Sequence, residues 1–169
     1  TPAANANGSA TVTIVTSDGG GTDNGGVDRT TNTFTITVTA VNDAPSVTLA
    51  QSTVTVLEDA GAQSFTGFAT FSAGPANESA QTLVGYTVSH NNGGLFSSAP
   101  TLAANGTLTF TPAANANGSA TVTVIAQDNA GTTDGGVDKT TNTFTITVTA
   151  VNDAPSVAFS ANPVVVAID

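Results

Sequence analysis

The stretch from Thr141 to Val151 reads TNTFTITVTAV, and its residues 143–149 alternate hydroxyl and apolar side chains without interruption. Phe144, Ile146 and Val148 fall on one side of an extended chain and the threonines on the other, because successive side chains of a β-strand point to opposite faces. The stretch therefore predicts a strand with one face in a core and the other covered by hydroxyl groups.

This stretch occurs twice, because it belongs to a long internal repeat. The segment TPAANANGSATVT begins at Thr1 and returns at Thr111, a displacement of 110 residues. Residues 1–59 and 111–169 align without insertion or deletion, and 41 of 59 positions are identical. A period of this length corresponds to a whole domain, not to one turn of a solenoid. We therefore interpret the chain as a segment of a longer array of tandem repeats.

Two prolines, Pro45 and Pro155, each follow Val-Asn-Asp-Ala and mark the predicted junctions between repeats. Proline restricts the preceding residue to extended conformations and so stiffens the connection between two repeats. We divide the chain into residues 1–43 as the last strands of one repeat, residues 44–153 as a complete repeat, and residues 154–169 as the first strand of the next.

The same alternation predicts the remaining strands of the complete repeat. They are expected at Ser46–Leu57, Gln63–Ala69, Thr82–Ser89, Thr107–Thr111 and Ser119–Gln127. Asn-Gly and Gly-Gly pairs separate several of them as turns. About seven strands in one period, without helical periodicity, predict an all-β fold, an immunoglobulin-like Greek-key β-sandwich.

The composition narrows the range of partners. Charged residues make up 8% of the chain, and its net charge is −10, with Arg29 and Lys139 as the only basic residues. This balance argues against nucleic acid or an anionic membrane as a partner and favours a cation. The chain has no cysteine for disulfides or thiolate metal sites. It also has no apolar run of the roughly 18 residues that a membrane helix needs, so we expect no direct membrane insertion, and any secretion signal or anchor outside this segment.

Eleven of the twelve acidic residues gather in the last interstrand loops, the linkers and the end of the first strand, and only Glu78 stands apart. With neighbouring asparagines they form the set of candidate metal ligands: Asp18, Asp28, Asp128, Asp134, Asp138, Asn42, Asp43, Asn152, Asp153, Glu58 and Asp59.

In a sandwich, the last interstrand loop and the incoming linker lie at the same end. Asp128, Asp134 and Asp138 should thus face the linker residues 42 and 43. A first strand from Pro45 to Glu58 would span roughly 40 Å, about the length of the domain, and bring residues 58 and 59 next to the linker residues 152 and 153. Many oxygen donors and no sulfur suit Ca²⁺, which takes 6–8 oxygens. The alternative interpretation is that these acidic residues lie in solvent-exposed loops and only confer solubility.

The linker motif resembles that of a known family. V-N-D-A-P at Val41–Pro45 and Val151–Pro155 resembles the D-x-N-D-N-A-P linker of cadherins, A-Q-D-N-A-G at Ala126–Gly131 resembles their motif with a Ca²⁺-binding aspartate, and Glu58 matches an acidic residue at the base of their domain. The whole period is similar to the bacterial cadherin-like or Ig-like tandem repeats of giant, RTX-like cell-surface and biofilm adhesins. This resemblance implies an extracellular stalk that binds Ca²⁺. Ala40 and Ala150 stand where cadherins carry the first linker acid, so we expect one or two ions per junction.

Three classes of function follow from these patterns. The first is a structural extender whose partners are neighbouring repeats of the same chain, stiffened by Ca²⁺. The second is a filament subunit joined to identical chains by strand complementation. An enzyme is the weakest hypothesis, because the sole histidine, His90, lies in a Ser-His-Asn-Asn-Gly-Gly turn and is absent from the repeated segments.

Overall fold

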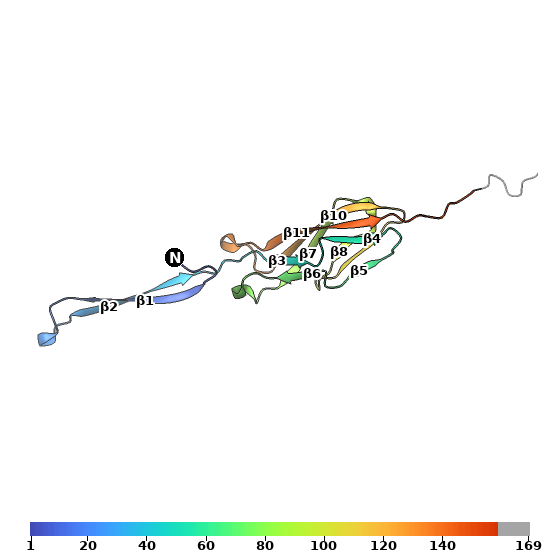
Figure 1. The fold of residues 1–169 in the computed structure, drawn as a ribbon. Coiled ribbons are helices and arrows are strands. Elements are labelled where there is room, and N and C mark those ends of the chain that lie inside the picture. The colour runs from blue at the N-terminus through green and yellow to red at the C-terminus, as the bar shows by residue number, and fades with distance from the viewer. Residues whose placement is uncertain (159–169) are drawn as a thin grey trace, which may run out of the picture.

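The computed structural model describes residues 1–158, and their regular structure consists of strands and four single 3₁₀ turns. Figure 1 shows an elongated molecule with a two-stranded hairpin at one end, a body of nine strands, and residues 150–158 leaving at the other end. The predicted all-β fold is confirmed for this part of the chain. None of its helical turns is long and apolar enough to cross a membrane.

The strands of the body form several sheets with a defined order. Their bounds are β3 Ser46–Leu49, β4 Thr53–Leu57, β5 Gln63–Phe65, β6 Ala69–Ser72, β7 Leu83–His90, β8 Phe96–Leu102, β9 Leu108–Pro112, β10 Gly118–Asp128 and β11 Lys139–Thr149. The largest sheet has the order β4-β11-β10-β7, and the other two have the orders β3-β6 and β5-β9-β8. All pairs are antiparallel except β4 with β11. The four 3₁₀ turns are η1 Asp23–Gly25, η2 Ala76–Glu78, η3 Gly93–Leu95 and η4 Thr133–Gly135.

One hydrophobic core lies between these sheets. Val122 and Ile146 of the largest sheet are fully buried, as is Leu108 of β9. The Phe68 and Phe144 rings contact each other at a centroid distance of 4.7 Å, which joins the β5–β6 connection to β11. Sheets that share a core in this way are consistent with a β-sandwich.

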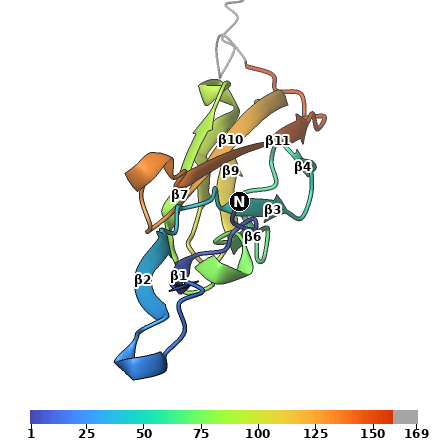
Figure 2. The same ribbon diagram turned by 90° about the vertical axis from the view of Figure 1, so that its left-hand side faces the viewer.

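The hairpin consists of β1 (Gly8–Ser17) and β2 (Arg29–Val38), and its register repeats that of β10 on β11 pair by pair, 110 residues earlier. Its surroundings differ. Phe34 and Ile36 are 49% and 48% exposed, whereas their counterparts Phe144 and Ile146 are buried. In the part of the chain that the structure describes, the hairpin thus has the inward face of a sandwich without a facing sheet (Figure 2).

Two strands that the alternation predicts as continuous are broken in the structure. Ser46–Leu57 divides into β3 and β4, because the segment crosses from the sheet of β6 to that of β11. Gln63–Ala69 likewise divides into β5 and β6 around Gly67, which has a φ of +65°. Asn142 ties β3 to the opposite sheet, since its Nδ2 donates a 2.6 Å hydrogen bond to the Val47 carbonyl. The predicted first strand of the next repeat, residues 154–169, lies mostly outside the described residues, and residues 154–158 form no strand.

Candidate functional site at the repeat junctions

Asn42 of the first linker is held by the last interstrand loop of the body. Its Nδ2 donates a 2.7 Å hydrogen bond to the Val137 carbonyl, and it lies 3.2 Å from both carboxylate oxygens of Asp128 and from the Gly131 carbonyl. Its Oδ1 accepts a 2.9 Å bond from Gln81 Nε2, and its backbone carbonyl accepts a 2.9 Å bond from the Val137 N–H. A single linker side chain thus joins the β6–β7 and β10–β11 connections.

Asp128 is the last residue of β10, and its side chain is 1% exposed. Besides the Asn42 amide, its Oδ1 accepts a 2.9 Å bond from the Ala130 N–H, which fixes the loop as it leaves the strand. The linker can approach because residue 136 is glycine: a Cβ at Gly136 would lie 2.9 Å from Asn42 Cβ. The Asp-Gly-Gly segment of this loop is therefore shaped around the linker.

Glu78, in the 3₁₀ turn η2, holds the next linker residue. Its side chain is 4% exposed, and its Oε1 accepts a 2.8 Å hydrogen bond from the Asp43 N–H. Its Oε2 is buried without a hydrogen-bond partner among the described residues, and so is Gln81 Oε1. Gly74 makes room for the carboxylate, because a Cβ there would clash with Glu78 Oε2. Two buried oxygen atoms at one junction thus have unused acceptor capacity.

Glu58 makes the corresponding contact at the other end of the body. It follows β4 and is 4% exposed. Its Oε1 accepts a 2.7 Å bond from the Val151 N–H, and its Oε2 lies 3.2 Å from Asn117 Nδ2. Its own N–H donates to the Thr149 carbonyl over 3.1 Å. Glu58 therefore holds the outgoing linker where β11 ends.

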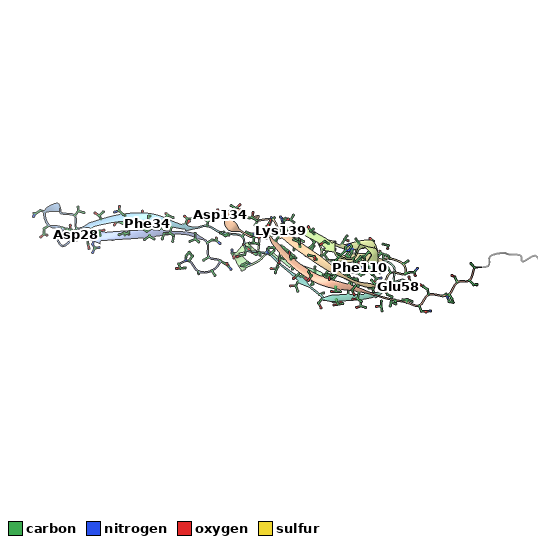
Figure 3. All side chains as sticks on the ribbon, turned by 90° about the horizontal axis from the view of Figure 1, so that it is seen from above. Asp28, Phe34, Glu58, Phe110, Asp134 and Lys139 are labelled. Atoms are coloured by element: carbon green, nitrogen blue, oxygen red, sulfur yellow. The ribbon has the colours of Figure 1, made fainter. Side chains whose placement is uncertain are left out.

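These three carboxylates, Glu58, Glu78 and Asp128, are the buried charged side chains of the described chain, and each bonds to a linker residue. Figure 3 shows the two ends of the body that they occupy, with Asp134 at the hairpin end and Glu58 at the opposite end. Burial of a carboxylate is costly unless hydrogen bonds compensate it. The buried carboxylates of the body thus fix the chain as it enters and leaves.

The other predicted ligands lie around this arrangement. Asp134 is exposed at a φ of +56° and lines a pocket of about 210 Å³ with Asn42, Glu78 and Gln81. Asp138 does not bond to the linker, and its carboxylate accepts a 2.8 Å bond from Gln127 Nε2.

At the outgoing junction, Asp59, Asn152 and Asp153 are exposed, and within residues 1–158 the one hydrogen bond of Asn152 Nδ2 goes to the Asp153 carbonyl. Asp18 and Asp28 lie at the distal end of the hairpin, joined by a 3.0 Å backbone bond, in the geometry of Asp128 and Asp138. Within residues 1–158, no three acidic or histidine side chains come together as a ready metal site.

The two junctions present complementary halves of one arrangement. At the first junction, Asp128 and Glu78 show how a body holds the linker that precedes it. At the second junction, Glu58 shows how a body holds the linker that follows it. Comparison of the sequence with protein-family models and with curated proteins found no match. The case for a function therefore depends on the geometry of this chain.

Glu78 and Gln81 were not among the predicted ligands. They lie in the part of the period that occurs once in the chain, so the repeat comparison could not single them out. The sequence offered one signal for Glu78: it is the one acidic residue that lies outside the loops, the linkers and the end of the first strand where the others gather. Only the fold of the β6–β7 connection brings it to the linker.

Proposed function

We propose that this chain is part of an extracellular stalk, in which tandem sandwiches act as a structural extender of a surface adhesin or fibre. The observation that carries the proposal is that every buried carboxylate of the described body is bonded to a linker residue. A domain that uses its costly buried charges in this way is built to fix the direction of its neighbours.

The strand order supports a Greek-key sandwich of immunoglobulin or cadherin type for each repeat. One sheet of that fold has the order A-B-E-D and the other pairs C, F and G. The sheets β3-β6 and β5-β9-β8 match the first order if β3 is strand A, β6 and β5 are the two parts of strand B, β9 is E and β8 is D. Strands β7, β10 and β11 match C, F and G, and β4 is an added parallel strand beside β11. The matching registers of β1–β2 and β10–β11 support the tandem repetition of this unit.

We further propose that Ca²⁺ binds at the junctions and makes them rigid. Glu78, Asp128 and Asp134, with the side-chain Oε1 of Gln81, would hold the ion from the following repeat, and Glu58 from the preceding one. The linker between them would add one aspartate, which is Asp43 at the first junction and Asp153 at the second. The buried Glu78 Oε2, which has no hydrogen-bond partner among residues 1–158, fits this role, since a hard cation prefers carboxylate and amide oxygens. The ion would neutralise carboxylates that otherwise repel one another.

Calorimetric titration of the chain with Ca²⁺ tests this proposal, with Glu78→Gln as the decisive variant. Glutamine keeps an acceptor for the Asp43 N–H and removes the charge, so the linker contact is retained while Ca²⁺ affinity should fall at least tenfold. Asp23→Asn is the matched control: it makes the same change in charge at an exposed residue in the distal turn η1. No detectable Ca²⁺ binding, or equal affinities for both variants, would contradict the proposed ion site.

A further inference from the structure

A pull along the chain must cross the body between its two linkers, and both linkers meet β11. The incoming linker is bonded just before this strand: the Asn42 carbonyl accepts a 2.9 Å bond from the Val137 N–H, and Asn42 Nδ2 donates a 2.7 Å bond to the Val137 carbonyl. The outgoing linker, with Val151, continues directly from the end of β11. A pull that enters at Asn42 is therefore passed to the start of β11 and leaves from its end.

The chain also gives the pull a second route into β11. From the incoming linker it continues into β3 and then into β4, which pairs in parallel with β11 from Thr53 opposite Thr145 to Leu57 opposite Thr149. Figure 1 shows β4 beside β11 at the end of the body from which the outgoing linker leaves. Any pull that is not taken up at Asn42 reaches β11 through this ladder of backbone bonds.

The parallel direction of β4 and β11 decides how this ladder is loaded. The incoming linker pulls β4 from its N-terminal end, and the outgoing linker pulls β11 from its C-terminal end. In a parallel pair these two ends lie at opposite ends of the ladder, so the strands are pulled to slide past each other. All bonds of the ladder are then loaded together, whereas a pull on both strands from one end would open the bonds one at a time.

Polar and apolar contacts both oppose this sliding. The ladder begins with a 3.0 Å bond from the Thr145 N–H to the Ser52 carbonyl and ends with a 3.1 Å bond from the Glu58 N–H to the Thr149 carbonyl. Between these bonds Val54 is 1% exposed, so sliding would also move its side chain out of the core. Separation of β4 from β11 by sliding must therefore break backbone bonds and core packing in one step.

We propose that this body resists tension along the chain, with β11 as the strand that transmits the pull and the β4–β11 ladder as the contact that resists it in shear. The source of the tension rests on the proposed stalk, since an extender between a surface and a bound target is pulled when the two separate. The resistance itself uses the backbone bonds and core packing of one body and needs no cation. It can therefore be tested separately from the proposed ion site.

Single-molecule pulling of the whole chain in EDTA tests this inference through the choice of attachment points. The chain has no cysteine, so handles can be attached at introduced pairs. Thr53→Cys with Thr149→Cys pulls the ladder from opposite ends. Leu57→Cys with Thr149→Cys is the matched control and pulls the ladder from one end. All three residues are exposed, and the two pairs enclose nearly the same part of the body.

The attachment at residues 53 and 149 should unfold the body at a force at least about twofold higher than the attachment at 57 and 149, because forced unfolding depends on the barrier along the direction of the pull. Equal forces, or a higher force for the control pair, would overturn the proposal. A difference in force that follows a difference in urea midpoint between the two variants would overturn it as well. Since no Ca²⁺ is present, the expected difference persists even if the calorimetric titration detects no ion binding.

Discussion

Replacement of Asn42 by alanine should destabilise the body although the residue lies in a linker. The side chain contacts the Val137 carbonyl, the Asp128 carboxylate and Gln81 Nε2. Its counterpart in the next linker, Asn152, is exposed, and among the described residues its side chain bonds to the Asp153 carbonyl alone. Because the two asparagines have the same sequence around them, Asn152→Ala is a matched control.

The magnitude follows from the bonds that the amide makes. Its two N–H groups serve the Val137 carbonyl, for about 1 kcal/mol, and the Asp128 carboxylate, for about 1.5–3 kcal/mol. The bond accepted from Gln81 adds about 1 kcal/mol. Water can replace part of the exposed bond to Val137, which reduces the expected loss for Asn42→Ala to about 3 kcal/mol. Asn152→Ala should change stability by less than about 0.5 kcal/mol.

Urea unfolding followed by tyrosine fluorescence measures this difference. Tyr86 is the sole tyrosine, the chain has no tryptophan, and Tyr86 lies on β7 opposite Ala126, so the signal reports the body and not the hairpin. If Asn42→Ala and Asn152→Ala unfold at the same urea concentration, the linker is not held by the body, and the reasoning above is wrong.

Two further substitutions test the opposite junction and the link between sheets, with the same unfolding assay. Glu58→Ala removes the acceptor of the Val151 N–H and should lower the free energy of unfolding by about 1–3 kcal/mol. Asp59→Ala, at an exposed neighbour, should leave it almost unchanged. Equal effects of the two substitutions would mean that Glu58 does not hold the linker. Asn142→Ala removes the bond from β11 to β3 and should cost about 1–2 kcal/mol, and the equivalent Asn32→Ala in the open hairpin should leave the transition unchanged. A loss of similar size at both asparagines would rule out the contact between sheets as its cause.

The sequence predicted the strands with strict alternation well, because their pattern is local. Phe144 and Ile146 fall in the core as expected. The break between β3 and β4 was not predicted, although the apolar positions change phase across residues 50–52, from Val47 and Leu49 to Val54 and Val56. The chain leaves one sheet there because its partners, β6 and β11, belong to different sheets, and this is tertiary information.

Strand β8 was missed for a related reason. It contains Pro100, which normally argues against a strand. β8 lies at the edge of the β5-β9-β8 sheet, and its pairing with β9 is irregular between Ser98 and Thr101, so a residue without an N–H is tolerated.

The candidate site was predicted in part. The expectation that Glu58 reaches the end of the body near the next linker agrees with its bond to Val151, and Asp128 lies against Asn42. The role of Glu78 depends on how the β6–β7 connection folds over the linker, and no spacing in the sequence encodes that contact.

Distance measurement between spin labels across the first junction tests whether the linker is rigid and whether Ca²⁺ makes it so. The chain has no cysteine, so labels can be placed on Thr33→Cys in β2 and Thr87→Cys in β7, both at exposed positions. We expect a single narrow distance distribution in Ca²⁺ that broadens in EDTA and broadens further with Asn42→Ala. Distributions of equal width in Ca²⁺, in EDTA and in the variant would contradict a junction that is clamped by the body and stiffened by the ion.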